Sequence, residues 1–207
     1  MFDSILFDLD GTLWDTTDIV AEAWNTILEN ENGIDVRVTG AQLRELFGRP
    51  LPEIASIIFP ELSKEEQVSL IGRCCEEEHR ALEKTPGILY PELEETLDAL
   101  SKKYPLCIVS NCEAGYIELF LRVTGLTKYF TDHICPGDTG MGKGDNNLAL
   151  VKRNGFQAPV YVGDTLGDAN AAAYAKIPFI FAGYGFGQVT EYYAKINAFS
   201  ELKSLLL

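Results

Sequence analysis

The sequence has little positive charge. Its 17 lysine and arginine residues stand against 31 aspartate and glutamate residues, which gives a formal net charge of −14 at neutral pH. A surface with this balance repels the backbone of nucleic acids and the head groups of anionic membranes, so we expect neither as a partner. A small anionic substrate would need a local positive centre in order to bind.

Long hydrophobic runs are also missing. No stretch approaches the roughly 20 apolar residues of a transmembrane helix. The N-terminal MFDSILFDLDG has no basic region before its short apolar run, so we expect no signal peptide. The five cysteines are odd in number and lack the spacing of a disulfide framework or of paired C-x-x-C ligands. These features together predict a protein of the reducing cytoplasm.

Short apolar runs alternate with helical patterns along most of the chain. Five runs are expected to be strands, the last of them the weakest: 4–9, 106–110, 160–164, 178–183 and 132–135. Three segments between them carry apolar residues at helical spacing: 91–104, 114–125 and 146–155. This alternation predicts an α/β fold with a Rossmann-like, doubly wound parallel sheet. Ligands of such sheets bind at the carboxyl ends of the strands.

The segment 15–84 interrupts this alternation. It contains helical patterns at 18–30, 39–59 and 63–84 and no clear strand, and Thr85-Pro86-Gly87 then resembles a linker. We therefore predict two domains. Residues 1–14 and 85–207 form an α/β catalytic core, and residues 15–84 form an inserted α-helical cap.

Carboxylates follow two of the expected strands. Asp8 and Asp10 come from DLDGT, and Asp164 and Asp168 come from GDTLGD. A single aspartate at a strand end is usually a turn or capping residue. If both strands belong to one parallel sheet, however, all four carboxylates meet at its carboxyl edge. Two like charges about 4 Å apart repel by about 4 kcal/mol at an effective dielectric near 20, whereas a helix cap contributes about 1 kcal/mol. A divalent cation relieves this repulsion, and carboxylate oxygens suit Mg²⁺.

The pair Asp8 and Asp10 predicts covalent and acid–base chemistry. Residues two apart on a strand point to the same face, so these side chains are expected side by side. Crowding raises the pKa of a carboxyl that does not touch the metal. One aspartate can then attack the substrate while the other delivers a proton to the leaving oxygen.

Four motifs in order resemble those of the haloacid dehalogenase-like superfamily, most of whose members are aspartate-dependent phosphatases. FDLDGTLWDT resembles the first motif, SNCE (110–113) the second, Lys143 the third and VGDTLGD the fourth. The order and separations match over the whole chain. The helical insertion and the closing PFIFAGYGFG resemble the phosphoglycolate phosphatase-like subgroup, whose members carry an α-helical cap. The resemblance implies Mg²⁺-dependent hydrolysis of a small phosphate monoester.

The resemblance also implies roles for the residues that match the first three motifs. Asp8 is the nucleophile that forms an aspartyl-phosphate. Asp10 is the general acid and base, and its backbone carbonyl meets the metal. Ser110 and Lys143 bind the phosphoryl oxygens and neutralise their charge.

Two further residues have metal roles by the same resemblance. Asp164 binds Mg²⁺ through its side chain, and Asp168 contacts the metal indirectly. Asn111 is a candidate for orienting the substrate. The third motif departs from the commoner Lys-Pro spelling, because glycines flank Lys143 on both sides. This predicts a flexible loop around the lysine.

The segment PGDTGMGKGD (136–145) also resembles a nucleotide-binding phosphate loop. Gly137 and Gly142-Lys143 have the spacing of that loop, but Gly144 stands where a hydroxyl should reach Mg²⁺. Asp138 and Asp145 also place carboxylates where anions would bind. We therefore assign Lys143 to the acidic edge of the sheet.

Several residues outside the four motifs have competing interpretations. Cys74 and Arg80 have the C-x5-R spacing of thiol-dependent phosphatases, but three glutamates lie between them and would repel phosphate. We expect this run to be a solvated face of a cap helix, and His79 and His133 to be surface residues. Arg49 lies in a glycine- and proline-flanked turn, where it either pairs with a surface carboxylate or binds a remote anionic group of the substrate.

Alternative functions stay open at this point. A phosphosugar mutase would use the same residues and differ only in its product. A haloacid dehalogenase would use Asp8 without metal or proton donor, which the acidic motifs argue against. A non-catalytic metal-binding module is a third class. Phosphoglycolate, sugar phosphates and nucleoside monophosphates are all compatible with the sequence as substrates. The sequence gives no indication of the oligomeric state.

Overall fold

The computed structural model describes residues 2–31 and 33–207. Six strands form one parallel sheet in the order β5-β4-β1-β6-β7-β8. They are β1 (Ser4–Phe7), β4 (Leu106–Val109), β5 (Phe130–Ile134), β6 (Pro159–Gly163), β7 (Phe179–Ala182) and β8 (Ala194–Ile196). This order, with the first strand in the middle, is that of the Rossmann-like doubly wound fold. The predicted fold class is confirmed.

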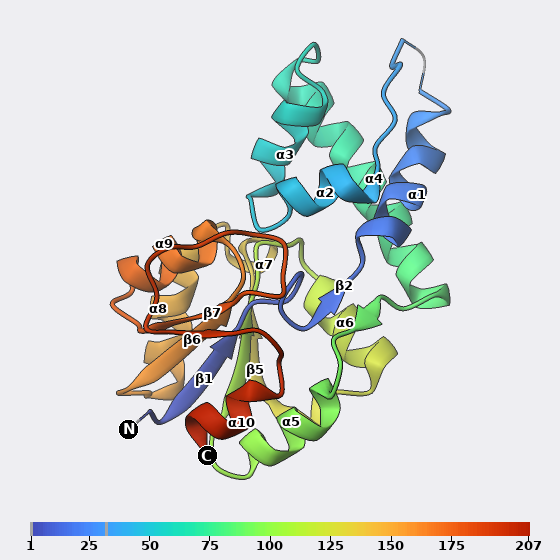
Figure 1. Ribbon diagram of the computed structural model, residues 1–207. Coiled ribbons are helices and arrows are strands. Elements are labelled where there is room, and N and C mark those ends of the chain that lie inside the picture. Colours follow the sequence, from blue (N-terminus) through green and yellow to red (C-terminus); the bar gives the residue numbers. More distant parts are fainter. Residues whose placement is uncertain (1, 32) are drawn as a thin grey trace.

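Helices cover both faces of the sheet (Figure 1). On one face lie α5 (Leu93–Ser101), α6 (Tyr116–Thr124) and α10 (Glu201–Leu206). On the other lie α8 (Lys143–Asn154) and α9 (Leu166–Tyr174). Every residue of β1, β4, β6 and β7 is buried, as expected for strands covered on both sides. The short helices α7 (Pro136–Thr139) and η1 (Thr127–Tyr129) lie in the connections that flank β5.

Alternate residues of the strands supply two hydrophobic cores. Phe7 packs into the core that contains α5 and α10, whereas its neighbour Leu6 packs into the core that contains α8 and α9. The predicted helices 114–125 and 146–155 both end at a glycine in the left-handed conformation, Gly125 (φ 71°) and Gly155 (φ 73°). Both expected stops are confirmed.

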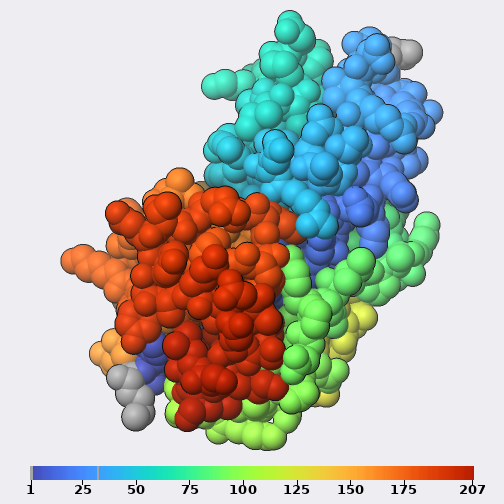
Figure 2. All heavy atoms as spheres, viewed as in Figure 1, coloured from blue at the N-terminus to red at the C-terminus, as the bar shows by residue number. Residues whose placement is uncertain are grey.

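In the described part of the chain, four helices lie between β2 (Trp14–Asp15) and β3 (Ile88–Leu89): α1 (Thr17–Leu28), α2 (Gly40–Leu46), α3 (Leu51–Ile58) and α4 (Lys64–Lys84). They form a lobe above the carboxyl ends of the strands in Figure 1, and this lobe projects from the rest of the molecule in Figure 2. The lobe has apolar contacts of its own, because α1 packs along α4. Among the described residues, no helix combines the length and hydropathy needed to cross a membrane.

The antiparallel pair β2–β3 ties the two ends of this helical segment together. Trp14 faces Leu89 and Asp15 faces Ile88 in the register of the pair. These two-residue strands, and the three-residue β8, were not expected because they are too short to show an alternating pattern. β1 also ends at Phe7, two residues before the predicted end of the run 4–9.

Candidate active site

The acidic motifs meet where the strand order of the sheet reverses. β1 pairs with β4 on one side and with β6 on the other. Asp8 follows β1, Ser110 follows β4 and Asp164 follows β6. In doubly wound sheets the crevice at this reversal is the usual site for a ligand. The predicted convergence of distant motifs on one sheet edge therefore occurs.

Three carboxylates form a compact cluster at this edge. Asp8, Asp164 and Asp168 each offer an oxygen within 4.8 Å of the others, and all three residues are buried. Asp168 lies in the first turn of α9, where its Oδ2 accepts hydrogen bonds from the backbone N–H (2.9 Å) and the hydroxyl (2.7 Å) of Thr165. Asp164 Oδ2 accepts from the backbone N–H of Phe186 at 2.7 Å. The cluster is thus held by backbone and side-chain donors from several loops.

Lys143 is the cation of the cluster. Its Nζ donates to Asp8 Oδ1 at 2.6 Å and also to Asp168 Oδ1. The prediction of a flexible loop around it was wrong, because Lys143 is buried and is the first residue of α8. The flanking glycine Gly144 has a packing reason, since a Cβ there would come within 2.6 Å of the Tyr174 ring. Lys143 serves the acidic edge, as expected.

The cluster carries more negative than positive charge. Burial raises the pKa of Asp8, and the charge of Asp168 raises it further. Burial, followed by Asp168 and Asp8, raises the pKa of Asp164 well above its usual range. Three buried carboxylates with one lysine are therefore short of a positive charge. Hard oxygen donors in this arrangement fit a Mg²⁺ ion.

Asp10 stands apart from the three-carboxylate cluster. Because β1 ends at Phe7, the strand-alternation argument that put Asp10 beside Asp8 was wrong. The Asp10 carboxylate instead accepts hydrogen bonds from Tyr116 Oη (3.0 Å) and Thr16 Oγ1 (3.2 Å). Desolvation raises the pKa of Asp10 to about 6. Asp10 is therefore a carboxyl group fixed by hydroxyl donors and available for proton transfer.

A cavity of about 40 Å³ separates the sheet edge from the helical segment. Asp8, Asp10, Ser110 and Asn111 line it from below. Asn111 Nδ2 also donates to the backbone carbonyl of Gly48 at 2.8 Å, so it joins the sheet edge to the helical segment. Ser110 is buried at the carboxyl end of β4.

Arg49 forms the surface ion pair that was one of its two predicted roles, and binding an anionic group of the substrate stays a prediction. Its guanidinium forms an ion pair with Glu53 one turn along, and about half of its side chain is exposed. It also lines the rim of the cavity. Arg49 therefore belongs to a surface ion pair and also lies beside the cavity.

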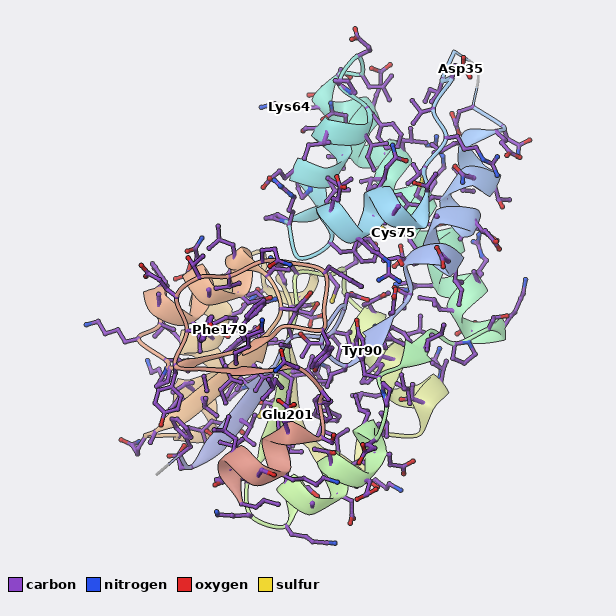
Figure 3. All side chains as sticks on the ribbon, in the orientation of Figure 1. Asp35, Lys64, Cys75, Tyr90, Phe179 and Glu201 are labelled. Atoms are coloured by element: carbon purple, nitrogen blue, oxygen red, sulfur yellow. The ribbon has the colours of Figure 1, made fainter. Side chains whose placement is uncertain are left out.

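What α4 contributes to the cavity was not predicted. The solvated face expected around 74–80 is right for Glu76 and Arg80, which are exposed, but wrong for Cys74, Cys75 and Glu78, which are buried. Cys75 lies at the base of the helical segment, toward the sheet (Figure 3), and lines the cavity with Glu78 and His79. A signal was present: Leu70, Ile71, Cys74, Cys75, Glu78 and Leu82 recur at helical spacing. The expectation of surface histidines also fails, since both histidines are partly buried, His79 beside Tyr116 and His133 in β5.

Comparisons with known proteins agree on one family. A family model described as haloacid dehalogenase-like hydrolase matches residues 5–182. The phosphoglycolate phosphatase of Escherichia coli (strain K12) is 28% identical over 211 aligned positions, which cover 88% of this chain and 81% of that protein.

Two solved structures have the same fold as this chain. A hydrolase described as putative and haloacid dehalogenase-like, from Bacteroides fragilis, has a TM-score of 0.86 at 22% identity and covers 98% of this chain and 100% of its own. CbbY from Rhodobacter sphaeroides, solved in complex with phosphate, has a TM-score of 0.82 at 19% identity and covers 98% and 96% of the two chains. At these identities the structural likeness shows the fold.

Gly11 allows the chain to pass close to the carboxylate cluster. It has a φ of +82°, and a Cβ on it would come within 2.2 Å of Asp164 Oδ2. Gly33 has nearly the same φ (+83°), but no described atom lies within 4 Å of its Cβ position. We predict that Gly33→Ala lowers the free energy of unfolding only by the strain of a left-handed backbone, about 1–2 kcal/mol. Gly11→Ala should lower the free energy of unfolding by more, because Asp164 must move. For the same reason it should weaken the binding of a Mg²⁺ ion by the carboxylate cluster.

Urea unfolding and Mg²⁺ titration calorimetry of the two variants measure these effects. Equal losses of unfolding free energy, or unchanged Mg²⁺ affinity in Gly11→Ala, would contradict this interpretation of the glycine.

Lys143 offers a second test of the cluster. In Lys143→Met the carboxylates of Asp8 and Asp168 lose their buried cation, so the free energy of unfolding in EDTA should fall by about 3–5 kcal/mol. Lys152→Met removes an exposed lysine from the same helix and should leave the unfolding free energy within about 0.5 kcal/mol of the wild type. Urea denaturation at neutral pH decides the matter, and similar values for both variants would refute the role of Lys143 as the cation of the cluster.

Proposed function

The chain belongs to the haloacid dehalogenase-like hydrolases, and from this premise we propose that it is a Mg²⁺-dependent phosphatase of small phosphate monoesters. The observation that carries the proposal is the buried cluster of Asp8, Asp164 and Asp168, to which Lys143 donates two hydrogen bonds. The name of the Escherichia coli relative, phosphoglycolate phosphatase, supports the same reaction class.

The carboxylates of Asp8 and Asp164 and the backbone carbonyl of Asp10 are the proposed metal ligands. Bound there, Mg²⁺ would offset the charge of the carboxylates and polarise a phosphoryl oxygen. Asp168 acts indirectly, because its oxygens are already engaged by Lys143 and Thr165. We assign it the task of holding Lys143 in place.

The first chemical step is proposed to be attack by the Asp8 carboxylate on phosphorus. As the bond from Asp8 to phosphorus forms, the bond from phosphorus to the alcohol oxygen breaks, and that oxygen takes a proton from Asp10. The raised pKa of Asp10 supports this role, because it keeps part of the acid form available near neutral pH. The Lys143 ammonium and the Ser110 hydroxyl donate to the phosphoryl oxygens as charge develops on them.

The second step returns the enzyme to its starting state. Asp10, now ionised, takes a proton from a water molecule as that water attacks phosphorus. The bond between Asp8 and phosphorus breaks, and inorganic phosphate leaves. Tyr116 and Thr16 hold the Asp10 carboxyl in both steps through their hydroxyl groups. One group therefore serves as acid and then as base.

We further propose that residues 15–84 act as a cap that opens for substrate and closes for chemistry. The support is the small volume of the cavity, about 40 Å³, whereas pockets for small molecules are commonly about 300–1,000 Å³. Opening would break the hydrogen bond between Asn111 and Gly48.

Five free cysteines are compatible with the proposed reducing, cytoplasmic location.

The alternative activities have less support. A haloacid dehalogenase needs no metal, and the three-carboxylate cluster would then have no purpose. A phosphosugar mutase would use the same groups, so its products, an isomerised sugar phosphate instead of inorganic phosphate, distinguish it.

Asp8→Asn tests the proposed nucleophile. An amide cannot form the aspartyl-phosphate, so hydrolysis of p-nitrophenyl phosphate with Mg²⁺ should fall by at least about 10³-fold, with an unchanged circular dichroism spectrum. EDTA should abolish wild-type hydrolysis, and added Mg²⁺ should restore it. Asp35→Asn, at the exposed far end of the helical segment (Figure 3), is the matched control and should retain wild-type activity. Full activity in Asp8→Asn, or insensitivity to EDTA, would refute the proposal.

A further inference from the structure

Glu78 is a cavity group that the proposed chemistry does not use. It lies on α4, is only 7% exposed, and lines the cavity opposite the sheet edge. Its Oε2 accepts a hydrogen bond from Trp24 Nε1 at 2.8 Å. No described residue donates to its Oε1. One oxygen of a buried carboxyl group is therefore available to a ligand in the cavity.

The described residues that line the cavity offer Glu78 no unpaired positive charge. Of the basic side chains that line it, Arg49 is at the rim and is already paired with Glu53. Burial lowers the pKa of His79, so its imidazole is neutral at neutral pH. Glu113, also in the lining, adds a further acidic group. The side of the cavity that faces away from the phosphate-binding residues is thus acidic.

The pKa of Glu78 reflects this lack of positive charge. Burial raises its pKa to about 8, and the charges of Asp10 and Glu113 contribute to the rise. A carboxyl group in this position takes up a proton unless a cation is present. A cationic group on a ligand would supply the missing charge and return Glu78 to its ionised form.

Aromatic side chains complete the surroundings. Trp24, Phe47 and Tyr116 line the same cavity as Glu78. Aromatic faces attract organic cations, and a carboxylate among them is a common way to bind an ammonium group. A carboxylate on the ligand supplies no positive charge, so it would form no ion pair with Glu78, and the nearby charge of Glu113 would repel it.

We propose that Glu78 determines substrate specificity by binding an ammonium group on the alcohol part of the substrate, which makes short aminoalkyl phosphates the preferred substrate class. This inference rests on the proposed phosphatase function. It separates this chain from a phosphoglycolate phosphatase, whose substrate would bring a carboxylate toward the acidic wall. The small cavity agrees with an alcohol of few atoms.

Three phosphate monoesters of similar length provide the test. Their alcohol parts carry an ammonium group (2-aminoethyl phosphate), no charge (propyl phosphate) or a carboxylate (phosphoglycolate). We expect wild-type kcat/KM, with Mg²⁺ at neutral pH, to be highest for 2-aminoethyl phosphate and lowest for phosphoglycolate. In Glu78→Gln the ratio of 2-aminoethyl phosphate to propyl phosphate should fall at least about tenfold. The glutamine oxygen can still accept from Trp24, so this variant removes the charge and keeps the internal hydrogen bond.

Glu76→Gln is the matched control. Glu76 is exposed on the same helix, where it pairs with Arg80, and its substitution should keep the wild-type ratio. Wild-type preference for phosphoglycolate would overturn the inference even if Glu78→Gln fails to fold. An equal loss for all three substrates in Glu78→Gln would overturn it as well, because it indicates a purely structural role. Hydrolysis of propyl phosphate without preference for the amine overturns only this inference, as does hydrolysis of p-nitrophenyl phosphate but of none of the three. If p-nitrophenyl phosphate is not hydrolysed either, the proposed function is overturned too.

Discussion

Repulsion among buried carboxylates is the constraint on which the site depends. Asp8, Asp164 and Asp168 lie within 4.8 Å of one another, and Lys143 is the single cation bonded to them in the described structure. Such a cluster is unfavourable unless further positive charge reaches it. The proposed metal site and the proposed phosphoryl chemistry both follow from this imbalance, because each provides or uses the missing charge.

The fold is arranged to hold this unfavourable cluster together. Parallel strands β1 and β6 deliver Asp8 and Asp164 to one edge, and the first turns of α8 and α9 deliver Lys143 and Asp168. The loop after β7 closes over Asp164, where a Cβ on Gly185 would come within 2.3 Å of the Asp164 Cβ. Gly185 and Gly187 of PFIFAGYGFG (178–187) are therefore needed for close approach to the acidic edge.

The sequence predicted the parts of the molecule that local patterns encode. Short apolar runs predicted five of the six strands of the parallel sheet, and aspartates after two of them predicted the acidic edge. The position of the Asp10 carboxyl could not be predicted, because it depends on where β1 ends and on hydroxyl groups of Thr16 and Tyr116. Glu78 was missed because a run of charged letters suggested solvent, whereas packing of α4 against α1 buries that face. Contacts between distant segments decide such positions.

A crystal structure grown with Mg²⁺ and inorganic phosphate tests the central claim most directly. The account predicts one Mg²⁺ bound to carboxylate oxygens of Asp8 and Asp164 at about 2.0–2.1 Å, with Lys143 still bonded to Asp168 and in contact with the phosphate. A Mg²⁺ ion bound elsewhere, or Asp8 and Asp164 carboxylates that separate around an empty cluster, would contradict it.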